Sequence, residues 1–326
     1  ELEVVAKVKT GKDVKEIRGE VEWEKRSGSS VIVHIKGGLL DFLKREDFVR
    51  RVEKDDTATD GVVGGWLATD ASVEENVVGA ETTSLFQAAL YRASGFEEMR
   101  AEDWGTVTDA GFKVYYYASS KELYGRYRGI VDRSKEAVQK NSAKLEGAKN
   151  AVKELVDKLL AKGRITVHPA AGLSASEAAE RVKRAAEDIL SPEAARRIEP
   201  VEHQAYGRVY YPLVDMLLRD VSEAEFAQFL TAAIFGDGTI TPYHVDLALG
   251  EFKPKGEALP YDKFHKLALW LAVIEKYRPV FEKYGVDITP GVYVGENIIL
   301  LRFDPRAAGL LFALGGGPVW RVYDKY

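Results

Sequence analysis

Apolar and polar positions along the chain predict a succession of helices and strands that occurs twice. Near the C-terminus, residues 226–236 form an apolar stretch rich in small residues, which favours a buried helix. Residues 241–249 then alternate between apolar and polar side chains, as a half-buried strand does. A helix over 261–284 and strands over 287–294 and 297–303 are predicted to follow.

The same order of elements is predicted for residues 57–119. A helix of small residues over 61–69 comes first, and an amphipathic helix over 83–93 follows a polar, hairpin-like stretch. Strands are predicted around 106–108 and 112–117. Both halves therefore have the order α-β-β-α-β-β, which makes the chain an internal repeat.

A small β-rich module is predicted before the first half. Its strands are expected over 2–8, 17–23 and 31–35, and a helix is expected over 39–52. With the segment between the halves, the chain is predicted to have four parts: 1–56, 57–119, 120–220 and 221–326.

The segment between the halves is predicted to be mainly helical. Apolar positions from 127 to 159 recur in steps of three and four, although Asn141 interrupts them. This seam predicts one long helix or an antiparallel pair packed on the body of the protein, in preference to an intermolecular coiled coil. Ser174 and Ser191 each begin a further helix, and residues 206–214 resemble a strand.

Composition and charge exclude several classes of function. The chain has no cysteine, which excludes disulfides, iron–sulfur clusters, thiolate zinc sites and cysteine nucleophiles. Its net charge is −5, with acidic and basic residues evenly distributed, so the footprint of a strong non-specific nucleic-acid binder is missing. Charged residues make up 30%, and Asn and Gln are scarce, as is typical of hyperthermophile proteins.

No targeting or membrane segment is apparent in the sequence. No stretch reaches the roughly 18 uninterrupted apolar residues of a spanning helix, and no basic-then-apolar leader begins the chain. A soluble, cytoplasmic protein is therefore expected. The first residue is Glu1 rather than Met, which is what a fragment or a processed product would show.

Two aspartates occupy matching positions in the two halves. Asp70 and Asp237 each follow a helix rich in glycine and alanine, and small residues three and four apart let two helix backbones approach closely. Such a helix pair would set the two carboxylates side by side at helix C-termini, where they repel one another. A divalent cation would neutralise them, and oxygen ligands favour Mg²⁺ or Ca²⁺. Each aspartate taken alone is also an ordinary turn residue.

These two stretches resemble the motif of the LAGLIDADG homing endonucleases. Residues 229–238 read FLTAAIFGDG, and residues 63–71 read VGGWLATDA. The resemblance implies an α+β fold with two αββαββ halves in one chain, beside an N-terminal β-rich module and a helical insertion between the halves. It implies a monomer that acts as a pseudo-dimer, with the two motif helices at its centre. The chain also resembles mobile-element proteins of crenarchaea, which agrees with its composition.

The resemblance also implies roles for particular residues. Asp70 and Asp237, the final acidic residues of the two motifs, would be catalytic and would bind the Mg²⁺ used for DNA cleavage. Double-stranded DNA would be faced by four polar residues: His244, Asp246, Glu75 and Asn76. Further catalytic cations are predicted in the last strand of each half, at Lys113 and Arg302. The predicted strands are poor in Lys and Arg, however, whereas a DNA-binding saddle needs cations to meet phosphates.

Three functions remain open at the level of sequence. The first is a Mg²⁺-dependent, sequence-specific DNA endonuclease of the homing type. The second is a catalytically inactive LAGLIDADG-derived nucleic-acid-binding protein or maturase. The third is a protein-interaction module without nucleic-acid binding, for which the long seam and the absence of a basic stripe are the supporting features.

Overall fold

The computed structural model describes residues 3–10, 13–27, 30–35, 49, 52–108, 111–250 and 261–323. Contacts divide the chain into two compact units. Unit 1 comprises Glu1–Asp56, Val77–Glu122 and Pro318–Tyr326, and unit 2 comprises Thr57–Asn76 and Leu123–Gly317. The predicted half 57–119 is therefore divided, since its first helix belongs to unit 2 and its later strands belong to unit 1.

Unit 1 is built on an antiparallel sheet with the strand order β1-β2-β3-β6-β7-β5. Helix α4 (Leu85–Ser94) packs on β5, β6 and β7, and Ala88 forms a buried cluster with Val49 and Tyr116. Gly95 ends α4 in the left-handed conformation, which glycine adopts without steric cost. The strands are β1 (Glu3–Thr10), β2 (Asp13–Ser27), β3 (Ser30–Ile35), β5 (Val77–Thr82), β6 (Glu98–Thr108) and β7 (Gly111–Ser120).

The strands predicted near the N-terminus are confirmed, and they belong to this larger sheet. Strand β3 pairs antiparallel with β6, with His34 opposite Trp104. The three strands therefore extend the sheet of the following half and do not form a sheet of their own. The helix predicted over 39–52 lies outside the described residues except at Val49 and Val52, which are both buried.

Unit 2 contains a second sheet, with the strand order β8-β11-β12-β10-β9. The alternation that predicted a strand over 241–249 puts Val245, Leu247 and Leu249 in the core. Helix α11 (Lys263–Glu282) contacts β10 and β12. The strands are β8 (Ile165–Val167), β9 (Gly238–Ile240), β10 (Val245–Gly250), β11 (Gly291–Val294) and β12 (Ile298–Phe303).

Two helices of unit 2 that lie far apart in the sequence pack closely together. Helix α3 (Asp60–Leu67) packs against α10 (Glu223–Asp237), and α9 (Ala205–Leu218) contacts α3. The remaining elements are β4 (Ser72–Glu74), α5 (Lys121–Lys140), α6 (Ser142–Ala161), η1 (Pro169–Ala171), α7 (Ala175–Ile189), α8 (Pro192–Ile198), η2 (Glu199–Val201), α12 (Pro305–Gly315) and α13 (Gly317–Tyr323), which belongs to unit 1 except for Gly317.

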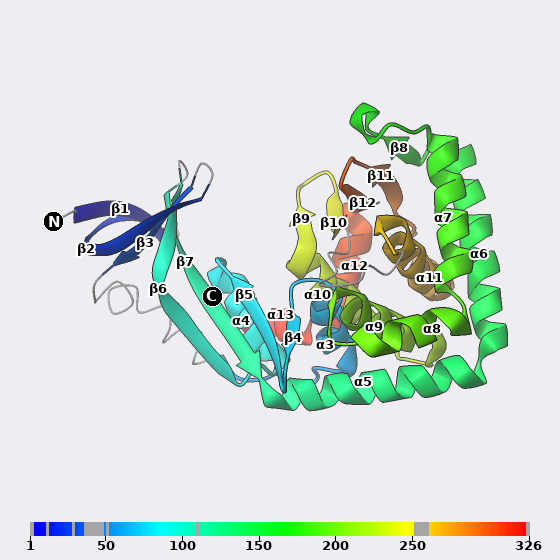
Figure 1. The fold of residues 1–326 in the computed structure, drawn as a ribbon, viewed down its shortest axis with the longest axis horizontal. Coiled ribbons are helices and arrows are strands. Elements are labelled where there is room, and N and C mark those ends of the chain that lie inside the picture. The colour runs from blue at the N-terminus through cyan, green and yellow to red at the C-terminus, as the bar shows by residue number, and fades with distance from the viewer. Residues whose placement is uncertain are drawn as a thin grey trace. The chain divides into compact units, whose positions relative to one another are not determined.

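The seam over 127–159 forms two helices that meet at a bend. Asn141 departs from helical geometry between α5 and α6, and its side-chain amide donates to the carbonyl of Ala137 over 2.9 Å. Figure 1 shows the two helices running in different directions, so neither the single helix nor the antiparallel pair forms. The seam nevertheless packs within unit 2, because Tyr127, Val152 and Leu159 are buried.

The strand predicted over 206–214 is wrong, because these residues belong to helix α9. Its apolar and aromatic side chains are buried on all sides, and Tyr210 and Tyr211 are both almost fully enclosed. A continuous apolar run has no period that distinguishes a buried helix from a strand. The α+β class is confirmed by both units, and no described helix is long and apolar enough to cross a bilayer.

Candidate functional site

Helices α3 and α10 pack directly against each other in unit 2 (Figure 1). A Cβ atom at Gly61 would overlap the carbonyl oxygen of Glu225. One at Gly65 would overlap the carbonyl oxygen of Phe229 and lie 2.7 Å from the Cβ of Ala232. Only glycine permits backbones to approach this closely. The packing predicted from the small residues of the two helices is therefore confirmed.

Asp70 and Asp237 lie together where these two helices end. Asp237 is the last residue of α10, and Asp70 stands in the turn after α3. Burial raises the pKa of Asp237 to about 6, and the charge of Asp70 and a hydrogen bond with its carboxyl add to the rise. Two carboxyl groups that share a hydrogen bond hold a proton between them. The structure thus brings together the two aspartates singled out in the sequence.

The turn that carries Asp70 is seated against the end of α10. A Cβ at Gly236 would overlap the side-chain hydroxyl of Thr69, so the glycine makes room for this residue. The Thr69 hydroxyl in turn donates to the carbonyl of Gly65 over 2.9 Å. Glycines therefore bring the two chain segments together along the helices and again beside the carboxylates.

Two cations, the buried Lys266 and the partly buried Arg208, accompany the carboxylates. Lys266 of α11 is 8% exposed, and burial lowers its pKa to about 8 while the charge of Asp237 opposes the fall. Burial likewise lowers the pKa of Arg208 of α9, against the charges of Asp237 and Asp70. Both cations in turn act to lower the pKa of Asp237. Sequence reasoning missed both residues. A lysine within a helix that has no polar face, such as Lys266, could have indicated a buried charge near a functional site.

Three other predicted residues meet on the outer face of the second sheet. Arg302 of β12 stands opposite Asp246 of β10 and donates from Nε and Nη2 to its two carboxylate oxygens over 2.8 and 2.9 Å. His244 Nε2 lies 3.4 Å from the same carboxylate. The hydrogen bonds with Asp246 raise the pKa of Arg302. Arg302 therefore forms an ion pair with Asp246 across two neighbouring strands of the sheet.

The remaining predicted residues are not brought to the carboxylates by the described structure. Glu75 and Asn76 are exposed in the turn between β4 and β5, where Glu75 has a positive φ of 46°. Lys113 lies in β7 of unit 1 opposite Thr106, and its side chain is outside the described part of the chain.

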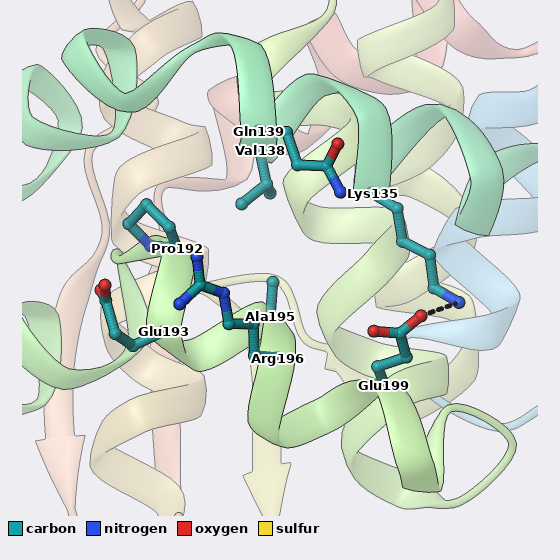
Figure 2. Close-up of a pocket in the computed structure, with 8 residues that line it drawn as sticks. All are labelled: Lys135, Val138, Gln139, Pro192, Glu193, Ala195, Arg196 and Glu199. Atoms are coloured by element: carbon teal, nitrogen blue, oxygen red, sulfur yellow. Dashed lines mark ion pairs between the residues drawn. The ribbon is translucent and has the colours of Figure 1, made fainter.

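A surface pocket of about 490 Å³ lies between α5 and α8 of unit 2 (Figure 2). Lys135 Nζ binds Glu199 Oε1 over 3.2 Å at one side of it, and Arg196 and Glu193 occupy the other. Positive and negative charges thus balance around the opening. The residues described around it include none of the site residues predicted from the sequence, and its lining selects no particular ligand charge.

The carboxylate pair has the donor chemistry of a magnesium site. Carboxylate oxygens are hard ligands, and Mg²⁺ in proteins often combines one or two of them with water and phosphate oxygens. Among the described residues, no group of three or more His, Cys, Asp and Glu side chains is arranged to hold a metal ion. Asp70 and Asp237 would therefore need water or a phosphate to complete the coordination.

Comparisons with family models, with curated proteins and with solved structures gave no match for this chain.

Proposed function

We propose that this chain is a nucleic-acid-binding protein of the LAGLIDADG type, in which Asp70 and Asp237 bind Mg²⁺ for the hydrolysis of double-stranded DNA. The observation that carries the proposal is the glycine-packed helix pair that ends in two adjacent carboxylates. Forcing two carboxylates together costs free energy, which a bound cation would recover.

The recurrence of the secondary structure supports the proposal. The chain runs α3-β4-β5-α4-β6-β7 and later α10-β9-β10-α11-β11-β12. The corresponding strands have the same spatial order, β6-β7-β5 in the first case and β11-β12-β10 in the second. Two αββαββ halves that each supply one motif helix would account for this recurrence, and a single chain would then act as a monomeric pseudo-dimer.

The residues of the site have separate parts in the proposed reaction. Asp70 and Asp237 would hold Mg²⁺, which supplies an activated water and stabilises the departing oxygen when it is bound. Lys266 would favour the ionised form of Asp237, because its charge opposes the rise in the pKa of that carboxyl. The burial of these groups excludes part of the competing water and strengthens their mutual interactions.

Calorimetric titration with MgCl₂ and CaCl₂ tests the metal site directly. Wild type should bind the ions, whereas Asp237→Asn and Asp70→Asn should lose the binding while remaining folded. Asp157→Asn is the matched control, since it removes the same charge from an exposed position on α6. Equal binding by all four proteins would contradict the proposed site.

The DNA partner is tested by selection from a randomised duplex pool. Sequences retained by wild type are enriched, sequenced and then incubated with MgCl₂. Cleavage of the enriched sequences by wild type, and not by Asp237→Asn, is the expected result. Failure to enrich any duplex at low salt would contradict DNA as the partner.

A non-cleaving nucleic-acid-binding protein on the same fold is the second candidate. Arg302 is the only basic residue in the described strands β8 to β12, and it is bound to Asp246. A sheet with so few cations is expected to hold DNA weakly. Enrichment of a duplex without Mg²⁺-dependent cleavage would favour this candidate.

A further inference from the structure

The turn after α3 lacks the usual means of ending a helix. The last carbonyls of a helix need donors from outside it, and a left-handed glycine commonly helps to supply them. Here the capping residue is Ala68, in right-handed geometry, and no basic residue occupies the last turn of α3. The turn nevertheless holds Asp70 in one place beside Asp237.

Part of the turn is held by hydrogen bonds of its own. The amides of Thr69 and Ala71 donate to the carbonyl of Trp66 over 3.1 and 2.8 Å. The Ala68 amide donates to the carbonyl of Gly64 over 2.9 Å. These bonds engage carbonyls within the helix and leave those of Leu67, Thr69 and Ala71 for a donor from elsewhere in the fold.

Arg208 of α9 supplies that donor. Its Nη1 lies 2.8 Å from the carbonyl oxygen of Leu67, 2.8 Å from that of Thr69 and 2.6 Å from that of Ala71. Hydrogen bonds from a charged group are stronger than neutral ones, and a buried carbonyl that loses its donor is costly. One side chain therefore binds both ends of the turn that contains Asp70.

The start of α9 fixes where Arg208 can lie. A Cβ at Gly207 would overlap the backbone of Glu202, so residue 207 is pressed against the preceding turn. Glu202 is itself held by Lys135 of α5, with 2.8 Å between Nζ and Oε2, and by Arg128. The contacts of Gly207 and Glu202 therefore fix the backbone from which the guanidinium of Arg208 extends. This backbone belongs to the region between the two halves of the repeat.

We propose that Arg208 is a positioning residue that holds the Asp70 turn in register with Asp237, so that the segment between the halves completes the carboxylate site. The proposal rests on the proposed function for its metal-binding consequence. Its structural part, the ordering of residues 67–72, stands independently of any metal. After α10 the chain continues differently, because Gly238 is extended and begins β9, which pairs with β10.

Hydrogen–deuterium exchange of the full-length protein tests the structural part. In Arg208→Gln, exchange of the peptide spanning 67–72 should accelerate about tenfold or more, because three carbonyls lose a charged donor. Arg219→Gln is the matched control, since it removes an ion-paired arginine next to the other end of α9. Equal acceleration of this peptide in both variants would overturn the proposal by showing general destabilisation.

Metal titration of the same proteins tests the functional part. Mg²⁺ affinity should fall about tenfold or more in Arg208→Gln and remain unchanged in Arg219→Gln. Arg208→Lys should restore part of the affinity, because its ammonium keeps the charge and three N–H donors. Unchanged affinity in a folded Arg208→Gln would overturn the positioning role. If wild type binds no Mg²⁺ while the exchange effect is specific, the proposed function fails and the ordering of the turn stands.

Discussion

Aspartate side chains have opposite surroundings at the ends of the helix pair and on the outer face of the second sheet. On the sheet, Asp246 is 7% exposed, and Arg302 satisfies both of its carboxylate oxygens. At the helix ends, burial raises the pKa of Asp237, and the charge of the adjoining Asp70 carboxylate adds to the rise. The carboxylate on the sheet is fully paired, whereas Lys266 and Arg208 only partly offset the two carboxylates at the helix ends. A cation bound at the helix ends is therefore expected to stabilise the folded protein.

Replacing Gly65 with Ala in the helix pair should have the largest effect on the stability of the protein. The new Cβ would overlap the carbonyl of Phe229, a backbone atom that cannot move without separating α3 from α10. Overpacking against backbone is expected to lower the free energy of unfolding by about 3 kcal/mol or more. Chemical denaturation measures the loss.

Gly147→Ala provides the matched control for this change. Gly147 lies in α6, and its new Cβ would meet nothing within 4 Å. Alanine should therefore stabilise that helix by roughly 0.5–1 kcal/mol. Similar losses in both variants would contradict the tight packing of α3 on α10.

Removing the charge of Asp237 should stabilise the protein when no metal is present. The folded-state pKa of about 6 lies above the ordinary 3.8, so the folded protein keeps a proton that the unfolded chain loses. This contribution lowers the stability as pH rises from about 4 to 6, and the loss persists above that range. At pH 7 the free energy of unfolding of Asp237→Asn should therefore be larger than that of wild type by roughly 2–3 kcal/mol.

Stability measured against pH and MgCl₂ checks this prediction. The difference between the two proteins should shrink as the pH falls from 7 to 4. Added Mg²⁺ should stabilise wild type at pH 7 and leave Asp237→Asn unchanged, since only a ligand of the folded state shifts the equilibrium. A variant less stable than wild type at pH 7 without metal would contradict the repulsion between Asp70 and Asp237.

Replacing Gly236 with Ala should have a smaller effect that is specific to the site. The new Cβ would overlap the hydroxyl of Thr69, the end of a side chain that can turn away, and also lie 2.9 Å from the Thr69 Cβ. A loss of about 1–2 kcal/mol is expected. In a double-mutant cycle, Thr69→Ala should offset part of this loss, because it removes the hydroxyl. Strict additivity would show that the two residues do not meet.

The helix pair was predictable from sequence because its pattern is local. Gly61 and Gly65 lie four residues apart in the first helix, Ala232 and Gly236 lie four apart in the second, and an aspartate comes at or shortly after the end of each. The short turns and the capping residue Ser222 likewise act within a few residues of the structure they specify. Such local patterns can be recognised in the sequence without knowledge of the rest of the fold.

The two cations of the site were not predictable in the same way. Arg208 lies in a continuous apolar run, and because such a run has no clear period, it led to a strand prediction. The contacts of Arg208 with the turn after α3 could therefore not be predicted. Lys266 lies in a helix that is buried on nearly every side, where a lysine would ordinarily mark the surface. Only the long-range packing of α9 and α11 brings these residues to Asp237.

The ion pair on the second sheet should show the smallest effect on stability. Arg302 is half exposed, so Arg302→Met is expected to cost about 1 kcal/mol or less, and a cycle with Asp246→Asn should give a coupling of similar size. If this face contacts DNA phosphates, the same variant should weaken binding to an enriched duplex and reduce its salt dependence by about one unit of slope. Full affinity and an unchanged slope in Arg302→Met would place the DNA contacts elsewhere and leave the helix ends as the functional part of unit 2.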